Sequence, residues 1–397
     1  MERDKNLELK KRRLLDSLVR RGYLADKRLY KAFLEINLED FIPKEYLQFN
    51  RLYEDIPNLF YFKNEENFRT ISAPHMISIM IQGLALETND DLLILGAKSG
   101  YIACLAHKLA PKGEIIILEA NSDIAKITLD NIIKMGYEDS ISVIVKNPLE
   151  GMPELSPWQK ILVTGAITQD RILPLLRQLD PNEGVLYAPI GEDYIQIYTQ
   201  ILRINNEYYG KKQLQVRFTP LMTQVELDEL QLITDLDEDE IEIKDDPKKV
   251  EDTLSKITIK YTSNILDEIK FEPLIKENVQ EEDRKMVILL LKNIQNKLKK
   301  FKKENDLEKG FDYIDDMEEL IENLIKYKNL FNLRVKKIQN FLNQIISLHI
   351  VRRDLEKKGI SDKSLIDRKI ELLNNQISIC NELYDFLNDE IKRAQSI

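Results

Sequence analysis

The sequence predicts an α/β fold, followed by an all-α helical bundle. Between residues 92 and 163, short apolar runs rich in branched residues are separated by segments of helical spacing, which is typical of parallel strands joined by helices. Beyond Val225 only Gly310 and Gly359 remain of the 13 glycines, and apolar residues recur at helical spacing. Because 397 residues exceed the usual size of one hydrophobic core, we expect two domains.

A helical preamble precedes the sheet. Apolar residues at helical spacing predict a helix over 7–20, which Gly22 ends, and a second short helix over 27–36. Pro43 then enforces an extended turn. The sheet itself is expected to begin later in the chain.

The most informative stretch is the apolar run 92–95 and the turn that follows it. Gly96 and Gly100 flank this turn, and a helix starts at Tyr101. Glycines let the backbone approach a ligand closely, and a helix N-terminus presents unpaired N–H groups. The next strand stops at Glu119, about 20 residues past the turn, where a carboxylate takes both hydroxyls of a ribose. Strand, glycine turn, helix, strand and acid form the pattern of a mononucleotide-binding unit. Taken alone, this pattern is compatible both with binding of a nucleotide or S-adenosylmethionine and with α/β packing that binds no ligand.

Later segments extend the predicted sheet. Residues 141–145 and 161–163 are short, apolar and branched, as expected of buried strands. Residues 194–198 and 214–218 alternate between apolar and polar side chains, which predicts antiparallel strands with one wetter face.

Several stretches resemble protein-L-isoaspartate O-methyltransferases over about residues 7–222. The chain carries, in the family's order, Tyr-Glu-Asp-Ile-Pro (53–57), Thr-Ile-Ser-Ala-Pro-His-Met (70–76), Ser-Gly-Tyr (99–101) and later strands at 161–166, 184–191 and 216–221. The resemblance implies a Rossmann-like, S-adenosylmethionine-dependent methyltransferase domain over 1–222. Its preamble and substrate loop would occupy 1–68 and its core 69–222. The implied activity is methylation of isoaspartyl carboxylates in damaged proteins.

The resemblance also assigns candidate site residues. Ser72 matches the family serine beside the methyl group and the incoming carboxylate, although a serine two residues before Pro74 also suits a helix cap. Thr70 and His75 belong to the same catalytic loop. The resemblance assigns the cofactor to Gly96, Ser99, Gly100, Glu119 and Asn147.

Three positions depart from the family pattern. Ile94 stands where an acid is usual, Lys98 replaces the middle glycine of the turn, and Asn147 replaces the acid of a Gly-Asp-Gly that reaches the adenine. The loop 60–69 is also bulkier and more aromatic than the family's glycine-rich loop. A divergent methyltransferase and a methyltransferase-like pseudoenzyme that serves as a scaffold both remain open.

The sequence of the C-terminal part predicts a linker followed by a helical domain. The acidic run 235–240 predicts an extended linker over 223–256, because like charges repel. In 257–397, apolar residues step by three and four along 317–349 and 366–391, which predicts coiled-coil seams with a hairpin at Gly359. These seams close within one chain or between two, so this domain is a candidate for binding a protein partner or for self-association.

Composition disfavours several other classes. A net charge of −10 argues against general binding to nucleic acid, and the strand ending at Val163 lacks the Asn/Asp-Pro-Pro-aromatic tetrapeptide of amino-methylating enzymes. No apolar run suits a membrane span, and the charged start does not resemble a signal peptide, so we expect a cytoplasmic protein. Cys104 and Cys380 are expected in cores, and the three scattered histidines predict no metal.

Overall fold

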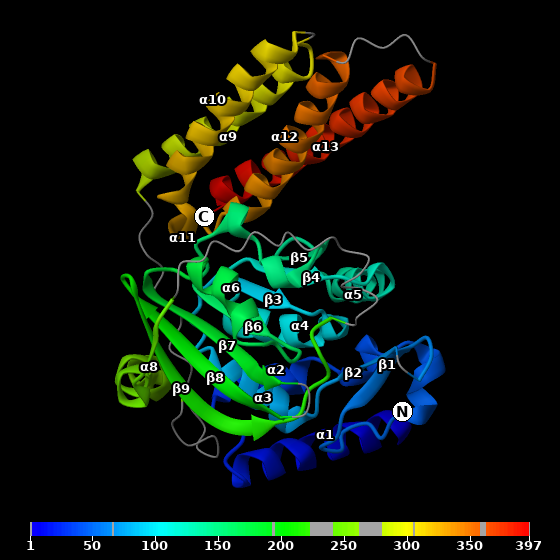
Figure 1. Cartoon of the computed structure of the whole chain (residues 1–397), viewed down its shortest axis with the longest axis vertical. Coiled ribbons are helices and arrows are strands. Elements are labelled where there is room, and N and C mark those ends of the chain that lie inside the picture. Colours follow the sequence, from blue (N-terminus) through cyan, green and yellow to red (C-terminus); the bar gives the residue numbers. More distant parts are fainter. Residues whose placement is uncertain are drawn as a thin grey trace. The chain divides into compact units, whose positions relative to one another are not determined.

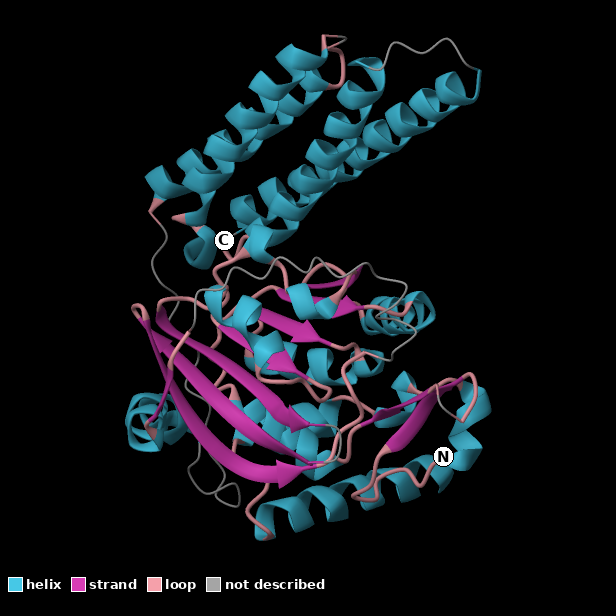
Figure 2. Ribbon diagram, viewed as in Figure 1, coloured by secondary structure: helices cyan, strands magenta, loops and turns pink. Residues whose placement is uncertain are grey.

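The computed structural model describes residues 2–65, 67–192, 195–222, 241–261, 280–304, 306–357 and 363–396. The chain divides into two compact units, Met1–Lys270 and Phe271–Ile397, and each has its own hydrophobic core (Figure 1). Sheet strands occur in the first unit, whereas the described part of the second unit is helical (Figure 2). The predicted order of an α/β sheet and then a helical region is confirmed.

An eight-stranded sheet forms the centre of the first unit, in the order β10-β9-β8-β7-β6-β3-β4-β5. The strands are β3 (Leu92–Leu95), β4 (Ile115–Glu119), β5 (Ile141–Val145), β6 (Lys160–Val163), β7 (Asn182–Glu192), β8 (Ile195–Ile204), β9 (Glu207–Val216) and β10 (Ile243–Asp245). Strands β3 to β7 pair in parallel, and β7, β8 and β9 pair antiparallel, as the alternation of the late strands predicts. The strand order reverses at β3, the place where open α/β sheets bind ligands.

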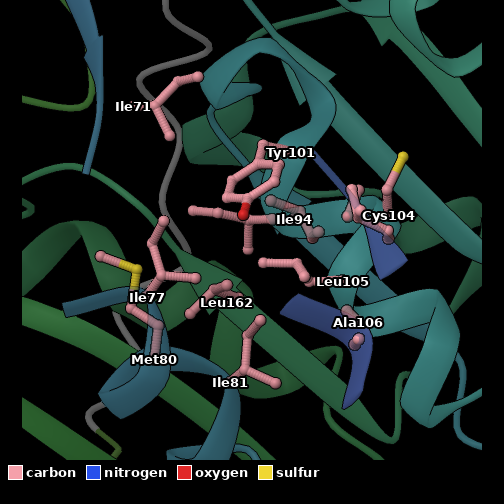
Figure 3. Packing of buried hydrophobic residues seen from close by; sticks show 14 of the residues in the cluster. Ile71, Ile77, Met80, Ile81, Ile94, Tyr101, Cys104, Leu105, Ala106 and Leu162 are labelled. Atoms are coloured by element: carbon pink, nitrogen blue, oxygen red, sulfur yellow. The ribbon is translucent and has the colours of Figure 1, made fainter. Parts of the chain in front are cut away.

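The two faces of β3 bury different partners. Ile94 is 1% exposed and packs with Tyr101 and Ile77 from two covering helices (Figure 3). Leu93 and Leu95 face a second core that lies under α6. The helices and short turns of this unit are α1 (Glu2–Arg20), α2 (Lys27–Glu35), η1 (Leu38–Phe41), η2 (Lys44–Phe49), α3 (Pro74–Gly83), η3 (Lys98–Gly100), α4 (Tyr101–Leu109), α5 (Ser122–Met135), η4 (Pro148–Glu150), η5 (Pro153–Leu155), η6 (Asp170–Ile172) and α6 (Leu173–Arg177).

Residues 241–261 extend the first unit, which the sequence did not predict. Strand β10 pairs in parallel with β9, and the helix α8 (Pro247–Tyr261) follows it. Val250 and Leu254 of α8 are buried against Val185 and Leu202 of the sheet. The second half of the predicted linker over 223–256 is therefore folded onto the sheet, and its first part, 223–240, lies outside the described residues.

The second unit contains α9 (Glu281–Phe301), α10 (Leu307–Ile325), α11 (Lys328–Phe331), α12 (Val335–Lys357) and α13 (Lys363–Ser396). Arg334, at the start of α12, bonds Glu390 near the end of α13, and Arg352 bonds Gln376 further back along α13, so these two helices run antiparallel. Gly359, where the hairpin was predicted, lies outside the described residues. The seam predicted along 317–349 does not lie on one continuous helix. It is divided among α10, α11 and α12, and Asn332, with φ +50°, ends α11.

The described residues contain neither a membrane-spanning helix nor a cluster of metal-ligating side chains. None of the helices placed by the structure is long and apolar enough to cross a membrane. Among the same residues, no group of three or more His, Cys, Asp or Glu side chains is placed so that it could hold a metal ion.

Candidate active site

The turn after β3 lies at the carboxyl edge of the sheet, against the end of β6. Gly96 has φ +90°, and a Cβ at this position would overlap the Oγ1 atom of Thr164. The Thr164 hydroxyl donates to the Leu95 carbonyl at 2.9 Å, so it is held in place. Only glycine fits here, because any other side chain would push the turn away from β6.

Glu119, at the end of β4, is fixed against the same turn. Its Oε2 atom accepts a hydrogen bond from the Ala97 backbone N–H at 2.9 Å, and Oε1 accepts one from the Asn121 N–H at 3.1 Å. Together with Gly96 and Thr164, Glu119 lines a cavity of about 20 Å³. The predicted glycine turn and the predicted ribose acid therefore meet at one cavity.

Other predicted cofactor residues do not line this cavity. Ser99 is buried with φ +57°, and its hydroxyl makes no hydrogen bond to a described residue. Gly100, at φ +85°, packs against Thr128 of α5. Asn147 caps η4, since its Oδ1 atom accepts from the Leu149 N–H at 3.0 Å and its amide donates to Glu150 at 3.3 Å. Ile94 points into the core beneath the turn (Figure 3).

A larger cleft of about 440 Å³ lies beside the cavity, and the three predicted catalytic residues line it together. Thr70 lies in the hairpin strand β2 (Phe68–Ile71), Ser72 follows the end of this strand, and His75 lies in the first turn of α3. Ser72 does not cap α3, because the capping position is Ala73 and no side chain bonds the helix end there. The Ser72 hydroxyl makes no hydrogen bond to a described residue and is available to a ligand.

His75 is oriented by a carboxylate that the sequence did not single out as a site residue. Its Nδ1 atom lies 2.7 Å from Asp55 Oδ1, its backbone N–H donates to the same oxygen, and Arg21 donates to Oδ2 at 2.9 Å. Burial raises the pKa of Asp55, but the hydrogen bonds from His75 and Arg21 outweigh it and lower the pKa below the usual value. Asp55 therefore stays ionised and holds the His75 ring against Tyr23.

The bulky loop 60–69 covers the smaller cavity. Its strands β1 (Asn58–Phe62) and β2 form a hairpin, and Phe60 is fully buried. Phe60 and Arg69 line the cavity beside Glu119. Phe60 thus helps to close the cofactor side of the site. Arg217, which lies after β9 and was not predicted as a site residue, lines the cleft.

Lys98 lines both the cavity and the cleft. Its backbone has φ +43°, a region that side-chain-bearing residues rarely adopt. Burial is the main cause that lowers the pKa of Lys98 to about 8, repulsion from Arg69 adds to it, and attraction to Glu119 opposes it.

Comparison with known proteins assigns this part of the chain to a family. Residues 9–226 match the family described as Protein-L-isoaspartate(D-aspartate) O-methyltransferase. The chain belongs to this family. The enzyme of Staphylothermus marinus is 31% identical over 222 residues, 54% of this chain and 95% of that protein, and the Ignicoccus hospitalis enzyme is 31% identical over 220 residues, 54% and 99%. A Plasmodium falciparum structure, titled a putative member in complex with S-adenosyl-L-homocysteine, is 27% identical, with a TM-score of 0.44 over 53% of this chain and 98% of that one.

Family membership makes the first unit an S-adenosylmethionine-dependent methyltransferase. The residues present fit the nucleoside end of this methyl donor, because Glu119 offers a fixed carboxylate and Gly96 keeps the turn open to close approach. The cavity of about 20 Å³ has room for about one water molecule. Binding therefore requires that Lys98, Phe60 or Arg69 move aside.

Proposed function

We propose that the first unit transfers a methyl group from S-adenosylmethionine to the carboxylate of an isoaspartyl residue in a damaged protein. The observation that carries this proposal is the shared cleft of Thr70, Ser72 and His75, which reaches Lys98 beside the Glu119 cavity. A cleft of about 440 Å³ is large enough for one amino-acid residue with its flanking backbone.

The proposed reaction requires the protein to position the two reactants but does not require a general base. S-adenosylmethionine supplies a methyl group on a sulfonium, whose C–S bond breaks as the new O–C bond forms. The accepting carboxylate has an ordinary pKa of about 4 and is already ionised near neutral pH. Ser72 donates its hydroxyl hydrogen bond to this carboxylate, and the Asp55–His75 pair holds the adjoining wall rigid.

The proposal is tested by measuring methyl incorporation into an isoaspartyl peptide and into a control peptide of the same sequence that contains an ordinary aspartyl residue. We expect methyl incorporation into the isoaspartyl peptide alone. Ser72→Ala removes one hydrogen bond to the acceptor and should lower kcat/KM about tenfold. Equal methylation of both peptides, or of neither, would contradict the proposed substrate.

A second candidate is a methyltransferase-like scaffold. The small cavity and the engagement of Asn147 in capping η4 favour it. In this case a protein partner, or a second copy of the chain, would bind through residues 257–397. Calorimetric titration with S-adenosylhomocysteine separates the two candidates: an enzyme binds it and loses binding in Glu119→Ala, whereas a scaffold that lost the cofactor gives no heat.

For either candidate we propose the cytoplasm as the compartment. Cys104 and Cys380 are both buried and unpaired, as is usual for proteins of reducing compartments.

A further inference from the structure

Lys98 occupies the junction of the active site. Among the residues that the structure describes, only Lys98 and Thr219 line both the cavity beside Glu119 and the cleft beside Ser72. Lys98 and Thr219 therefore border the place where the two spaces adjoin. The family pattern has a glycine here, and the lysine is accommodated in a left-handed backbone conformation that favours glycine.

The ammonium group of Lys98 is not paired within the described part of the chain. It makes no hydrogen bond and no salt bridge to a described residue. The nearby carboxylates are engaged elsewhere, since Glu119 accepts from two backbone N–H groups and Asp55 accepts from His75 and Arg21. An ammonium that loses part of its hydration without a counter-ion is destabilised, and a bound anion would remove this cost.

The surroundings add positive charge. Arg69 lies close enough to repel Lys98, and Arg217 lines the cleft. Lys98 thus lines both spaces, Arg69 lines the cavity and Arg217 lines the cleft. Such a focused positive region attracts a ligand carboxylate more strongly than the protein's net charge of −10 would suggest.

We propose that Lys98 binds a ligand carboxylate at the junction of the cofactor cavity and the substrate cleft. The proposal rests on the proposed function, in which two carboxylates come to this junction. One is the carboxylate of the methionine part of the methyl donor, and the other is the isoaspartyl carboxylate of the substrate. In both cases Lys98 supplies an ammonium group at a turn position where the family pattern has a glycine, which has no side chain.

Calorimetric titration of the full chain tests the proposal without a need for turnover. Lys98→Met keeps the length of the side chain and removes its charge, Lys98→Arg restores the charge, and Lys126→Met, an exposed lysine on α5, is the matched control. Each variant is titrated with S-adenosylhomocysteine and with 5′-methylthioadenosine, which lacks the amino-acid part. The isoaspartyl peptide is then titrated into protein saturated with S-adenosylhomocysteine. Thermal melts verify that each variant is folded.

The pattern of affinities identifies the carboxylate. If it belongs to the methyl donor, Lys98→Met binds S-adenosylhomocysteine at least about tenfold more weakly but 5′-methylthioadenosine equally well. If it belongs to the substrate, only the peptide weakens by this factor. In both cases Lys98→Arg recovers affinity and Lys126→Met behaves as the wild type.

Two results would overturn the proposal. The first is unchanged affinity of Lys98→Met for all three ligands, or no binding of any of them by the wild type. The second is tighter binding of S-adenosylhomocysteine by Lys98→Met, which would show that the lysine obstructs the cofactor. If the wild type binds S-adenosylhomocysteine but does not methylate the isoaspartyl peptide, the proposed substrate fails, and the comparison of the two nucleosides still decides the role of Lys98.

Discussion

At the scale of single residues, the site depends on a glycine that cannot be replaced. Gly96→Ala would place a Cβ over Thr164 Oγ1 at a backbone φ of +90°. We expect the turn to move away from β6 and affinity for S-adenosylhomocysteine to fall at least about tenfold, because a 1 Å displacement spoils positioned contacts. Calorimetric titration of the folded variant measures this loss.

Gly22→Ala is the matched control for this change. Gly22 has a similar φ of +76°, but a Cβ there would meet nothing within 4 Å. This variant should lose about 1 kcal/mol of unfolding free energy from backbone strain and keep its ligand affinity. Equal affinities of the two variants would show that close approach at Gly96 does not matter for binding.

The pKa of Lys98 gives a second residue-scale prediction. Only the charged ammonium attracts a carboxylate, and the pKa of about 8 in the unliganded protein means that this charge is lost as pH rises past 8. A bound carboxylate raises the pKa, so binding is coupled to proton uptake above pH 8. Affinity for the ligand that Lys98 holds should be nearly constant up to pH 7 and fall about tenfold between pH 7 and pH 9.

The control for this pH profile is the ratio of wild-type to Lys98→Met affinity, because other groups titrate equally in both proteins. The charged and titratable groups that face Lys98 or share its cleft are Arg69, Glu119, Asp55, His75 and Arg217. A ratio that stays constant from pH 6 to pH 10 would assign the pH dependence to these groups and not to Lys98.

At the scale of elements, one buried ion pair joins α12 to α13. Arg334 donates to Glu390 Oε1 through Nε at 2.8 Å and Nη2 at 2.6 Å, and Glu390 is fully buried. Arg334→Met removes the guanidinium that neutralises the buried Glu390 carboxylate. The backbone N–H of residue 334 at 3.0 Å and the Arg393 guanidinium at 3.3 Å remain as hydrogen-bond partners of this carboxylate. We expect a loss of about 3 kcal/mol in unfolding free energy of the helical unit, measured by urea denaturation of the full chain.

Two further variants show whether the stranded charge is the cause. Arg334→Met with Glu390→Leu removes both charges and should recover most of the stability. Arg284→Met breaks an exposed pair with Glu281 and should cost less than about 1 kcal/mol. If the double variant is as unstable as the single one, lost packing and not buried charge explains the effect.

The elements also show what spacing can and cannot predict. The steps of three and four along 317–349 correctly select buried residues, such as Met317, Phe331 and Ile338. They do not reveal the break at Asn332, because apolar spacing records burial and one left-handed residue can reverse the chain without disturbing it. Strand β10 and α8 were missed because the acidic run before them hides a short apolar pattern.

At the scale of the whole molecule, the sheet and the position of the site were predictable, and the neighbours within the site were not. The strand, turn and acid pattern placed Gly96 and Glu119 correctly at one edge. The pairing of His75 with Asp55 and the position of Arg217 near Lys98 join segments that are far apart in the sequence. Such contacts follow from the packing of the chain, which local patterns do not record.

The last prediction concerns where the methyltransferase unit ends. The family match stops at residue 226, whereas the compact unit extends to Lys270 and includes α8. A chain of residues 1–270 keeps Val250 and Leu254 buried on the sheet, and a chain of residues 1–222 exposes their partners Val185 and Leu202. Loss of two buried side chains costs about 4 kcal/mol, which corresponds to a fall in Tm of about 10 °C.

We therefore expect 1–270 to melt with the Tm of this unit in the full chain and to bind S-adenosylhomocysteine with unchanged affinity. The shorter chain 1–222 should melt about 10 °C lower. Since its turn, Glu119 and cleft wall are retained, it should still bind below its own Tm. Equal Tm values for the two truncated chains would mean that α8 adds no stability. Because each unit has its own hydrophobic core, we expect 1–270 to fold without the helical unit. Failure of 1–270 to fold would contradict this expectation and show that the helical unit is required.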